Sequence, residues 1–227
     1  MWKLNEVSLS GRRSPRLNGV SVEIPSGVTA VLGSSGAGKT SLLNVLVQFE
    51  RPTTGQVECC LQNSEGRLPY FWSPPTYGLW PHLTVRDHLS SVQLNPDDEP
   101  ELVGRLLAAF ELNHVSDARP GSLSLGERSR LSVARALACN AQVLVLDEPL
   151  AHVDSSRVGG YWSVIREHCA SRNTSLVLAT HSPEVVLREA SHVICLTSGR
   201  VIYSGDTRRL YEQPQSPEQA AMLGPCN

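Results

Sequence analysis

The segment VLGSSGAGKTS, residues 31–41, places glycines, a lysine and a hydroxyl residue at fixed spacing. Gly33, Gly38, Lys39 and Thr40 fit the pattern G-x-x-x-x-G-K-[ST]. Glycines let a backbone curl so that successive N–H groups point at phosphate oxygens, and a helix N-terminus adds positive potential. The pattern predicts a loop for the phosphates of a nucleotide, with Lys39 at the β- and γ-phosphates and the Thr40 hydroxyl on Mg²⁺. The predicted nucleotide-binding residues of this loop are Gly33, Ser34, Ser35, Gly36, Ala37, Gly38, Lys39, Thr40 and Ser41.

Two adjacent acids, Asp147 and Glu148, follow the apolar run VLVL of residues 143–146. The C-terminal ends of parallel strands line the ligand crevice of an α/β sheet. Asp147 suits the outer coordination sphere of the Mg²⁺ held by Thr40. Glu148 points to the opposite side of the chain, where it can polarise an attacking water. The pair therefore predicts a metal site at Thr40 and Asp147 and a catalytic role for Glu148.

The phosphate loop and the two acids must be positioned by strands and helices that alternate along the chain. The apolar runs VLVL and LVLA are typical of strands buried on both faces, and helical patterns separate them, which favours a mostly parallel α/β sheet. The first third is instead rich in strands and turns, which predicts an antiparallel β flank. Residues 76–121 carry no buried-strand pattern and are expected to form an inserted helical subdomain. We expect an α/β core over residues 1–75 and 122–213 and a tail over residues 214–227, all in one domain.

Composition excludes several classes of protein. The chain has 227 residues and a formal net charge of -2, which gives no reason to expect nucleic-acid binding. The N-terminus has no signal-peptide pattern, and no run approaches the roughly 20 apolar residues of a membrane span. The six cysteines show neither metal-ligand spacing nor a disulfide framework, which favours reduced thiols in a cytosolic protein. An adjacent pair, Cys59 and Cys60, leaves a redox switch open as an alternative to ordinary strand residues.

The stretch YFWSPPTYGLWPHLTV, residues 70–85, concentrates aromatic rings. Five of the twelve aromatic residues of the chain lie between Tyr70 and Trp80, together with Pro74 and Pro75. We expect this stretch to be too rich in proline to form a regular element. Its rings either pack inside a hinge or face a protein partner.

The motifs together resemble those of the ATP-binding cassette (ABC) ATPases. The segment LSLGERSRLSVARALA is similar to the signature segment of that family, usually LSGGQ followed by a helix with an ARAL run. LAHVD follows DEP like the family's D-loop, and LATHS follows a strand like its switch-histidine segment. The resemblance covers nearly the whole chain in family order. It implies a P-loop NTPase core with an inserted helical subdomain, and ATP and Mg²⁺ as ligands.

The resemblance also implies roles for residues outside the phosphate loop. Ser124, Gly126 and Glu127 resemble signature residues that bind the ATP held by a second copy of the chain. Asp154 resembles the D-loop aspartate that links the two sites of a dimer. His181 resembles the histidine that contacts the γ-phosphate and orients the water. The implied catalytic residues are Glu148, His181 and Lys39.

The chain departs from the family pattern at four positions. Pro75 stands where a glutamine usually contacts Mg²⁺ or water, which leaves slow hydrolysis open. Gly11 stands where an aromatic residue usually stacks on adenine, so that an arginine from the run at residues 12–16 is the expected substitute. Leu125 replaces a small signature residue, and Glu127 replaces the usual glutamine.

The segments PHLTVRDHL and DEPLAHVD and the tail are most similar to ATPases of importers for polyamines, iron, molybdate, thiamine or sugars. The resemblance implies integral-membrane permease subunits, a substrate-binding protein and a second copy of the chain as partners. It places the chain in the cytoplasm, on the inner face of the cell membrane. Two alternatives stay open: a non-transport ABC ATPase, and a nucleotide-binding regulator whose hydrolysis is weakened by Pro75. Trp72, Tyr77 and Trp80 are expected to border the groove that receives the membrane subunit, with at least one ring facing it.

Overall fold

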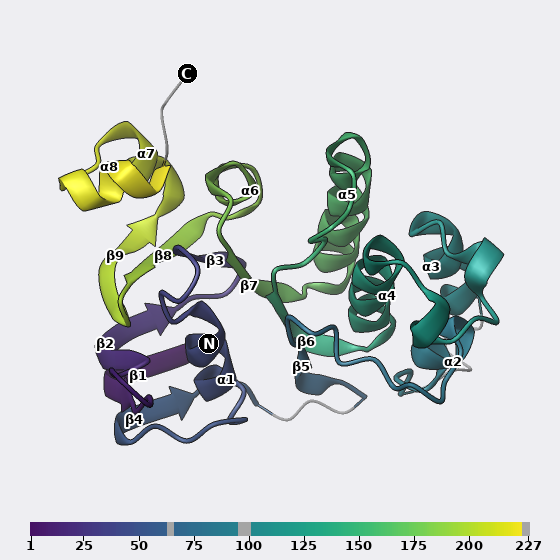
Figure 1. Cartoon of the computed structure of the whole chain (residues 1–227), viewed down its shortest axis with the longest axis horizontal. Coiled ribbons are helices and arrows are strands. Elements are labelled where there is room, and N and C mark those ends of the chain that lie inside the picture. The colour runs from purple at the N-terminus through teal and green to yellow at the C-terminus, as the bar shows by residue number, and fades with distance from the viewer. Residues whose placement is uncertain (63–65, 95–100, 224–227) are drawn as a thin grey trace. The chain divides into compact units, whose positions relative to one another are not determined.

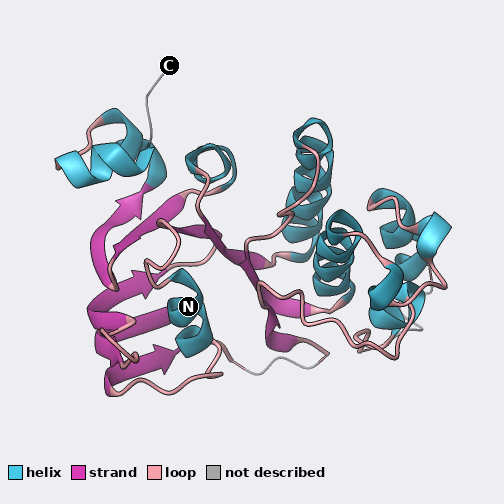
Figure 2. Ribbon diagram, in the orientation of Figure 1, coloured by secondary structure: helices cyan, strands magenta, loops and turns pink. Residues whose placement is uncertain are grey.

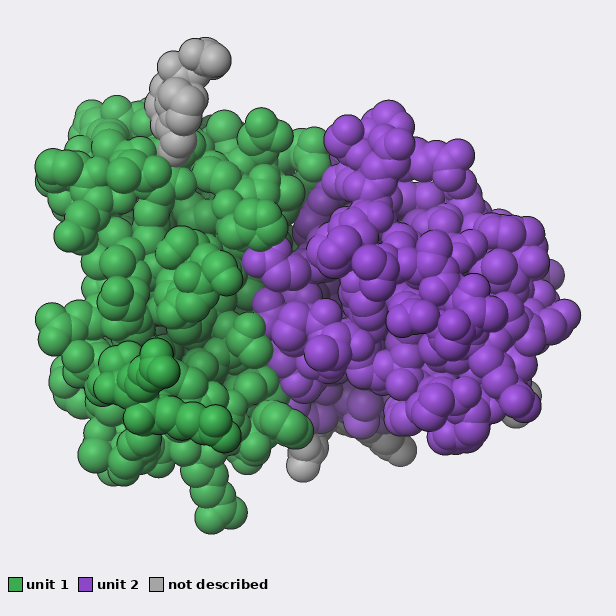
Figure 3. Space-filling view, viewed as in Figure 1, with its two compact units in different colours: residues 1–61, 176–227 green, residues 62–175 purple. Residues whose placement is uncertain are grey.

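The computed structural model of the chain describes residues 1–62, 66–94 and 101–223. The chain forms two compact units, which Figure 3 colours separately. Unit 1 comprises Met1–Leu61 and Leu176–Asn227, and unit 2 comprises Gln62–Ser175. The predicted division into core, helical subdomain and tail remains a prediction. Parts of that subdomain and tail, and Cys226, lie outside the described residues.

Unit 1 contains a three-stranded antiparallel sheet with the strand order β2-β1-β4 (Figure 1). Its strands are β1 (Trp2–Leu9), β2 (Leu17–Ile24) and β4 (Thr54–Cys59). Buried residues alternate with exposed ones along β2, and Leu4 of β1 pairs with Val22 inside the unit. This alternation is the mark of a sheet with one solvated face, and it confirms the predicted antiparallel flank.

Unit 1 also contains four strands of a mostly parallel sheet. These strands are β3 (Val28–Leu32), β7 (Ser175–Thr180), β8 (His192–Thr197) and β9 (Arg200–Asp206). β3 pairs in parallel with β7 and β8, and β9 runs antiparallel to β8. Ala30, Val31, Leu178 and Ala179 are completely buried, as expected for strands covered on both faces.

The helices of unit 1 in the described residues are among those drawn in cyan in Figure 2. They are α1 (Lys39–Leu46), α6 (Pro183–Glu189), α7 (Thr207–Glu212) and α8 (Pro217–Leu223). The helical pattern of residues 39–49 predicts a longer α1. The helix ends at Leu46 because Gln48 adopts a left-handed φ of 58° and the chain reverses there. Phe49 N–H then donates to Asn44 O at 2.9 Å, which closes the helix by a Schellman motif.

Unit 2 contains two parallel strands and the remaining helices. Its strands are β5 (Leu68–Ser73) and β6 (Ala141–Asp147), and its α-helices are α2 (Val85–Ser90), α3 (Leu102–Ala109), α4 (Leu125–Ala138) and α5 (Ser155–Arg172). Two 3₁₀ turns, η2 (Asn113–Val115) and η3 (Pro120–Ser122), lead into α4. Among the helices that the structure describes, none is both long and apolar enough to cross a membrane.

Strand β5 corrects one expectation from the sequence. The stretch that begins at Tyr70 does form a regular element up to Ser73, and β5 pairs with β6 along it. β5 lies at the edge of its sheet, and Pro69 falls between the paired positions Leu68 and Tyr70. Proline is tolerated at such a position because it removes no ladder hydrogen bond. The mixture of mostly parallel strands, one antiparallel sheet and helices confirms the predicted α/β fold class.

Candidate active site

The phosphate loop of unit 1 connects the end of β3 to the start of α1. Gly36 and Gly38 adopt φ values of 79° and 109°, which favour glycine. A Cβ on Gly38 would lie 2.6 Å from the carbonyl oxygen of Arg16, and one on Gly33 would lie 2.7 Å from that of Leu196. Both neighbours are backbone atoms, so the close packing behind the loop requires glycine at Gly33 and Gly38.

Hydrogen bonds hold the curl of this loop. Ala37 N–H donates to Ser34 O at 3.1 Å, and Gly199 N–H donates to Ala37 O at 2.9 Å. Lys39 Nζ donates to Gly33 O at 2.8 Å and to Ser34 O at 3.2 Å. The ammonium group is therefore drawn across the loop, and only 8% of Lys39 is exposed.

The first turn of α1 presents one hydroxyl to solvent. Thr40 is exposed, whereas Ser41 is buried. Gly38 caps α1 without a side-chain hydrogen bond, so the amide groups of the first turn face the region of the loop. This arrangement suits an anion. The exposed Thr40 hydroxyl suits the predicted contact with a cation, whereas the buried Ser41 suits the predicted contact with nucleotide less well.

His181 of unit 1 lies at the same edge of the sheet as the phosphate loop. β7 pairs in parallel with β3, and Thr180 lies opposite Leu32 in the register. His181 and Gly33 therefore follow the ends of neighbouring strands. His181 is exposed, and Ser182 behind it caps α6 by accepting from Val185 N–H at 3.4 Å. Unit 1 thus brings His181 and the phosphate loop together at one edge.

In unit 2, Asp147 ends strand β6 and Glu148 follows it directly. Asp147 is buried and Glu148 is half-buried. Glu148, Leu150 and His152 have positive φ values of 49°, 61° and 64°. Left-handed backbone at a non-glycine residue costs about 1–3 kcal/mol and persists only where surrounding structure enforces it. The segment from Glu148 to Asp154 is therefore a held conformation.

Asp154 ends this segment as the N-cap of α5. Its carboxylate accepts from Ser156 N–H at 2.8 Å and from the Ser156 hydroxyl at 2.7 Å. These hydrogen bonds lower the pKa of Asp154 below its ordinary value. The aspartate is ionised at neutral pH and is fixed at the helix start.

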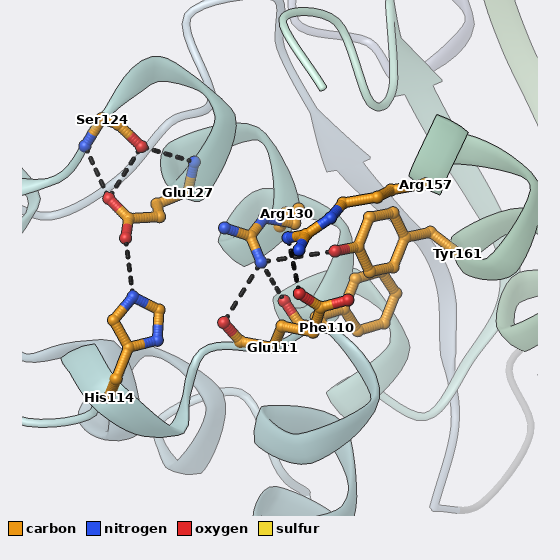
Figure 4. Close-up of polar contacts among 8 residues, drawn as sticks. All are labelled: Phe110, Glu111, His114, Ser124, Glu127, Arg130, Arg157 and Tyr161. Carbon is orange, nitrogen blue, oxygen red and sulfur yellow. Dashed lines mark hydrogen bonds and ion pairs between the residues drawn. The ribbon is translucent and has the colours of Figure 1, made fainter. Parts of the chain in front are cut away.

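Ser124 and Glu127 form a capping box at the start of α4 (Figure 4). Ser124 Oγ accepts from Glu127 N–H at 3.2 Å, and Glu127 Oε2 accepts from Ser124 N–H at 2.8 Å and from the Ser124 hydroxyl at 2.7 Å. The bonds from Ser124 hold the pKa of Glu127 below its ordinary value. His114 Nε2 lies 3.0 Å from Glu127 Oε1. A negative charge is therefore built into the first turn of α4.

The rest of the signature segment lies close to the segment that follows β6. A Cβ on Gly126 would lie 3.0 Å from the carbonyl oxygen of His152, so glycine permits this approach. Leu125 is 52% exposed, although it is a large apolar residue. Unit 2 thus brings the signature residues near the loop that carries Glu148 and Asp154.

Two rings of the aromatic stretch lie against a buried cation, Arg135 of α4. Its guanidinium donates to Gly78 O at 2.6 Å and to Tyr77 O at 2.9 Å. It lies 4.9 Å from the ring centroid of Trp80 and 5.6 Å from that of Phe71. Burial lowers the pKa of Arg135 to about 10, so the group is still charged at neutral pH. The stretch is held by two carbonyl bonds and two aromatic faces on this cation.

Exposure differs among the rings proposed for the groove. Trp80 is 39% exposed, and Trp72 and Tyr77 are half-buried. That one of them contacts a membrane subunit remains a prediction. Pro75 is exposed in the turn after β5 and offers no polar side-chain atom.

One arginine of the run at residues 12–16, Arg16, forms an ion pair. Arg16 binds Glu50 through both Nη atoms and donates from Nε to Ser10 O at 3.1 Å. Hydrogen bonds from a guanidinium lie in its plane, and the Arg16 side chain is 43% exposed, so stacking on a base by Arg12, Arg13 or Arg16 remains a prediction. A cavity of about 700 Å³ lies here; its lining residues are Ser10, Gly11, Arg12, Arg13, Ser14 and Arg16.

Sequence patterns assign no role to Arg135, His88, His114 or His152. The only local signal is at Arg135, where an arginine interrupts the apolar run of ARALA in a helix. The three histidines make their contacts through residues that are distant or unremarkable in the sequence.

A family model described as ABC transporter matches residues 17–151 of the chain, which is more than half of it. The chain is 34% identical over 220 residues to the arginine transport ATP-binding protein ArtP of Escherichia coli, covering 87% of this chain and 88% of that protein. It is 31% identical over 209 residues to the spermidine/putrescine import ATP-binding protein PotA 1 of Pseudomonas aeruginosa, covering 87% of this chain and 56% of that protein. It spans 65% of the sulfate/thiosulfate import ATP-binding protein CysA of Vibrio vulnificus, at 31% identity over 228 residues and 93% of this chain.

Solved structures share the fold. The ATP-binding subunit of an ABC transporter superposes with a TM-score of 0.79 at 20% identity, over 99% of this chain and 100% of that chain. The dimeric ABC transporter cassette MJ0796 superposes with a TM-score of 0.75 at 22% identity, over 92% of this chain and 99% of that chain. The family match and the similarity to ArtP over most of both chains lead to one conclusion: this chain belongs to the ABC transporter family.

Proposed function

We propose that this chain is the ATP-binding and ATP-hydrolysing subunit of an ABC transporter. The observation that carries the proposal is the phosphate loop of unit 1. Its glycines are required by backbone contacts, Lys39 spans its mouth, and His181 follows the neighbouring strand end. Such a loop binds the β- and γ-phosphates of a nucleoside triphosphate through backbone N–H groups and the lysine.

The two proposed metal ligands are of the residue types that Mg²⁺ takes in proteins. Mg²⁺ takes few protein ligands and completes its octahedron with water and substrate phosphates. Thr40 offers an exposed hydroxyl on the first turn of α1, and Asp147 offers a buried carboxylate at the end of β6. When bound, the ion neutralises charge on the β- and γ-phosphate oxygens.

Hydrolysis then requires a positioned water. Glu148 polarises the water for in-line attack on the γ-phosphorus, and His181 orients it against the γ-phosphate. Lys39 and the loop N–H groups stabilise charge as the bond to the leaving phosphate breaks. The products are the nucleoside diphosphate and inorganic phosphate.

A second copy of the chain completes the site in this proposal. Ser124, Gly126 and Glu127 begin a helix whose first turn is open to a partner, and Asp154 is fixed at the start of another. One solved cassette of the same fold is a dimer. A monomer should therefore hydrolyse ATP poorly, and the rate per chain should rise with protein concentration across the dimerisation range.

The proposed partners of the dimer are integral-membrane permease subunits and a substrate-binding protein. The relatives PotA 1, CysA and ArtP are named import or transport ATP-binding proteins, which supports an importer. The chain would act from the cytoplasm at the inner face of the cell membrane. Its exposed Trp80 is the best candidate for contact with the permease.

One observation supports a second candidate function, a nucleotide-binding regulator with weakened hydrolysis. Pro75 lacks the amide that contacts Mg²⁺ or water in the family, and its turn is exposed. Nucleotide binding would then survive while the rate of phosphate release fell.

Single-turnover ATP hydrolysis separates the two candidates. Glu148→Gln should lower the rate by about 100-fold or more, the usual contribution of a general base, while Mg-ATP binding is retained. Glu167→Gln, which removes an exposed carboxylate from α5, is the control and should leave the rate unchanged. Equal rates for the native chain and Glu148→Gln would favour the regulator.

A further inference from the structure

Three segments of unit 2 meet at one residue, His152. The hydroxyl of Tyr77, in the turn after β5, lies 3.0 Å from His152 Nδ1. The carbonyl oxygen of His152 lies against Gly126 at the start of α4, where a Cβ would be 3.0 Å away. His152 itself stands between Glu148 and Asp154. The aromatic stretch, the signature segment and the loop after β6 therefore share a single junction.

Tyr77 projects from a fixed base. Its carbonyl oxygen accepts from Arg135 Nη2 at 2.9 Å, and that of Gly78 accepts from Nη1 at 2.6 Å. Arg135 is only 2% exposed, so these bonds are shielded from water. Tyr77 has a φ of 68°, a left-handed value that other contacts must maintain. The backbone that carries the Tyr77 side chain is thus held from α4.

His152 stands in a left-handed backbone that needs support from its surroundings. Its φ of 64° and that of Leu150 at 61° are both unfavourable for these residue types. A hydrogen bond from a fixed partner stabilises one such conformation over others. The conformation selected here also sets the direction in which the chain reaches Asp154.

We propose that Tyr77 and His152 are positioning residues that tie the aromatic stretch to the Asp154 loop, an inference that rests on the proposed function. A subunit that docks beside Trp80 would displace the turn that carries Tyr77. Such a displacement breaks or makes the hydrogen bond between Tyr77 and His152. The loop from Glu148 to Asp154 then changes conformation together with its contact on Gly126. The pair transmits the state of one surface to the residues that meet the second copy.

A double-mutant cycle tests the link. Tyr77→Phe removes only the hydroxyl, and His152→Ala removes the ring nitrogen that it meets. Each should lower kcat of the dimer by about 3- to 10-fold, the range that one neutral hydrogen bond supplies, with the KM for ATP changed less than about twofold. The double variant should be no worse than either single variant, because both remove the same bond.

Rescue separates this link from a general structural role. His152→Asn keeps an acceptor close to Nδ1 and tolerates left-handed backbone, so it should restore kcat when Tyr77 is present and fail to do so in the Tyr77→Phe background. Tyr203→Phe is the matched control, because it removes a hydroxyl that donates to Asp206 O at 2.9 Å in unit 1. That control should leave kcat unchanged.

Several results would overturn the proposal: additive losses in the cycle, no loss with Tyr77→Phe, or an equal loss with Tyr203→Phe. A fall in melting temperature that accounts for the lost activity would also overturn it. If the native chain binds no Mg-ATP, the proposed function fails. If the native chain binds and hydrolyses ATP while Tyr77→Phe is unaffected, only the positioning link fails.

Discussion

Removal of the negative charge of Glu127 is the most specific way to perturb the proposed dimer. Glu127→Gln restores the residue type usual in the family and keeps the shape of the capping box with Ser124. The native carboxylate is held ionised by Ser124, and its side chain is only 16% exposed. In the proposed dimer it would stand beside the triphosphate of the second copy, where two negative charges repel. We therefore expect the substitution to strengthen ATP-driven dimerisation.

The magnitude follows from Coulomb's law. Two unit charges at about 4 Å interact by about 1 kcal/mol in water and about 4 kcal/mol at an effective dielectric constant of 20. Longer separation and partial pairing with His114 reduce this to about 1–2 kcal/mol per site, or about 5- to 30-fold in affinity for each of the two sites of the dimer. Within one chain the effect has the opposite sign. A carboxylate near a helix N-terminus stabilises it by about 0.3–1 kcal/mol, so the melting temperature should fall by at most about 4 °C.

Sedimentation in the Glu148→Gln background, with Mg-ATP present, measures the dimerisation constant without turnover. Glu111→Gln is the control. The Glu111 carboxylate forms an ion pair of 2.7 Å with Arg157, and this pair does not involve the first turn of α4 (Figure 4). Stronger dimerisation with Glu127→Gln alone supports the reasoning. An unchanged or weaker dimer would refute it.

Three further predictions concern the parts that hold the site. Gly38→Ala places a Cβ 2.6 Å from Arg16 O and should abolish Mg-ATP binding in calorimetry while the far-ultraviolet circular dichroism is kept. Arg135→Met leaves two carbonyl oxygens without their charged donor and should lower the free energy of unfolding by about 3–5 kcal/mol in urea titrations. His88 is completely buried, and burial lowers its pKa. Its contribution should be fully present above the unfolded pKa of about 6.5 and be lost as pH falls below it, and His88→Gln should flatten the pH dependence of unfolding in that range.

The histidine prediction rests on a defined tautomer. His88 Nδ1 lies 2.7 Å from Thr84 O, which can only accept, so Nδ1 carries the proton. Nε2 accepts from Trp80 N–H at 2.8 Å. Protonation of Nε2 would lose this bond and place a cation beside Arg135. A pH profile that is the same for native chain and His88→Gln would contradict this account.

Patterns of neighbouring residues in the sequence were sufficient to predict the phosphate loop and the buried strands. The glycine spacing before Lys39 predicted the loop, and the apolar runs VLVL and LVLA predicted β6 and β7. The limit of α1 was missed because its end depends on Gln48 in a left-handed conformation, which glutamine adopts only in context. β5 was missed because its proline is acceptable only at the edge of a sheet, a property of the assembled strands.

The contacts around the candidate site depend on distant residues. Arg135 is identified as the anchor of the aromatic stretch only when Tyr77 and Gly78 are placed beside α4. The bond between Tyr77 and His152 joins residues 75 positions apart. No periodicity or spacing encodes such a pair, because it is created by packing of α4 and the strands.

The central claim is that the loop ending in Lys39 and Thr40 binds the phosphates of ATP. Calorimetric titration of the native chain and of Lys39→Ala with Mg-ATP tests it most directly. We predict saturable binding of one nucleotide per native chain and at least about tenfold weaker binding to Lys39→Ala, since the ammonium makes charge-assisted bonds to phosphate. Absence of binding to the native chain, or equal affinity of the two proteins, would contradict the account.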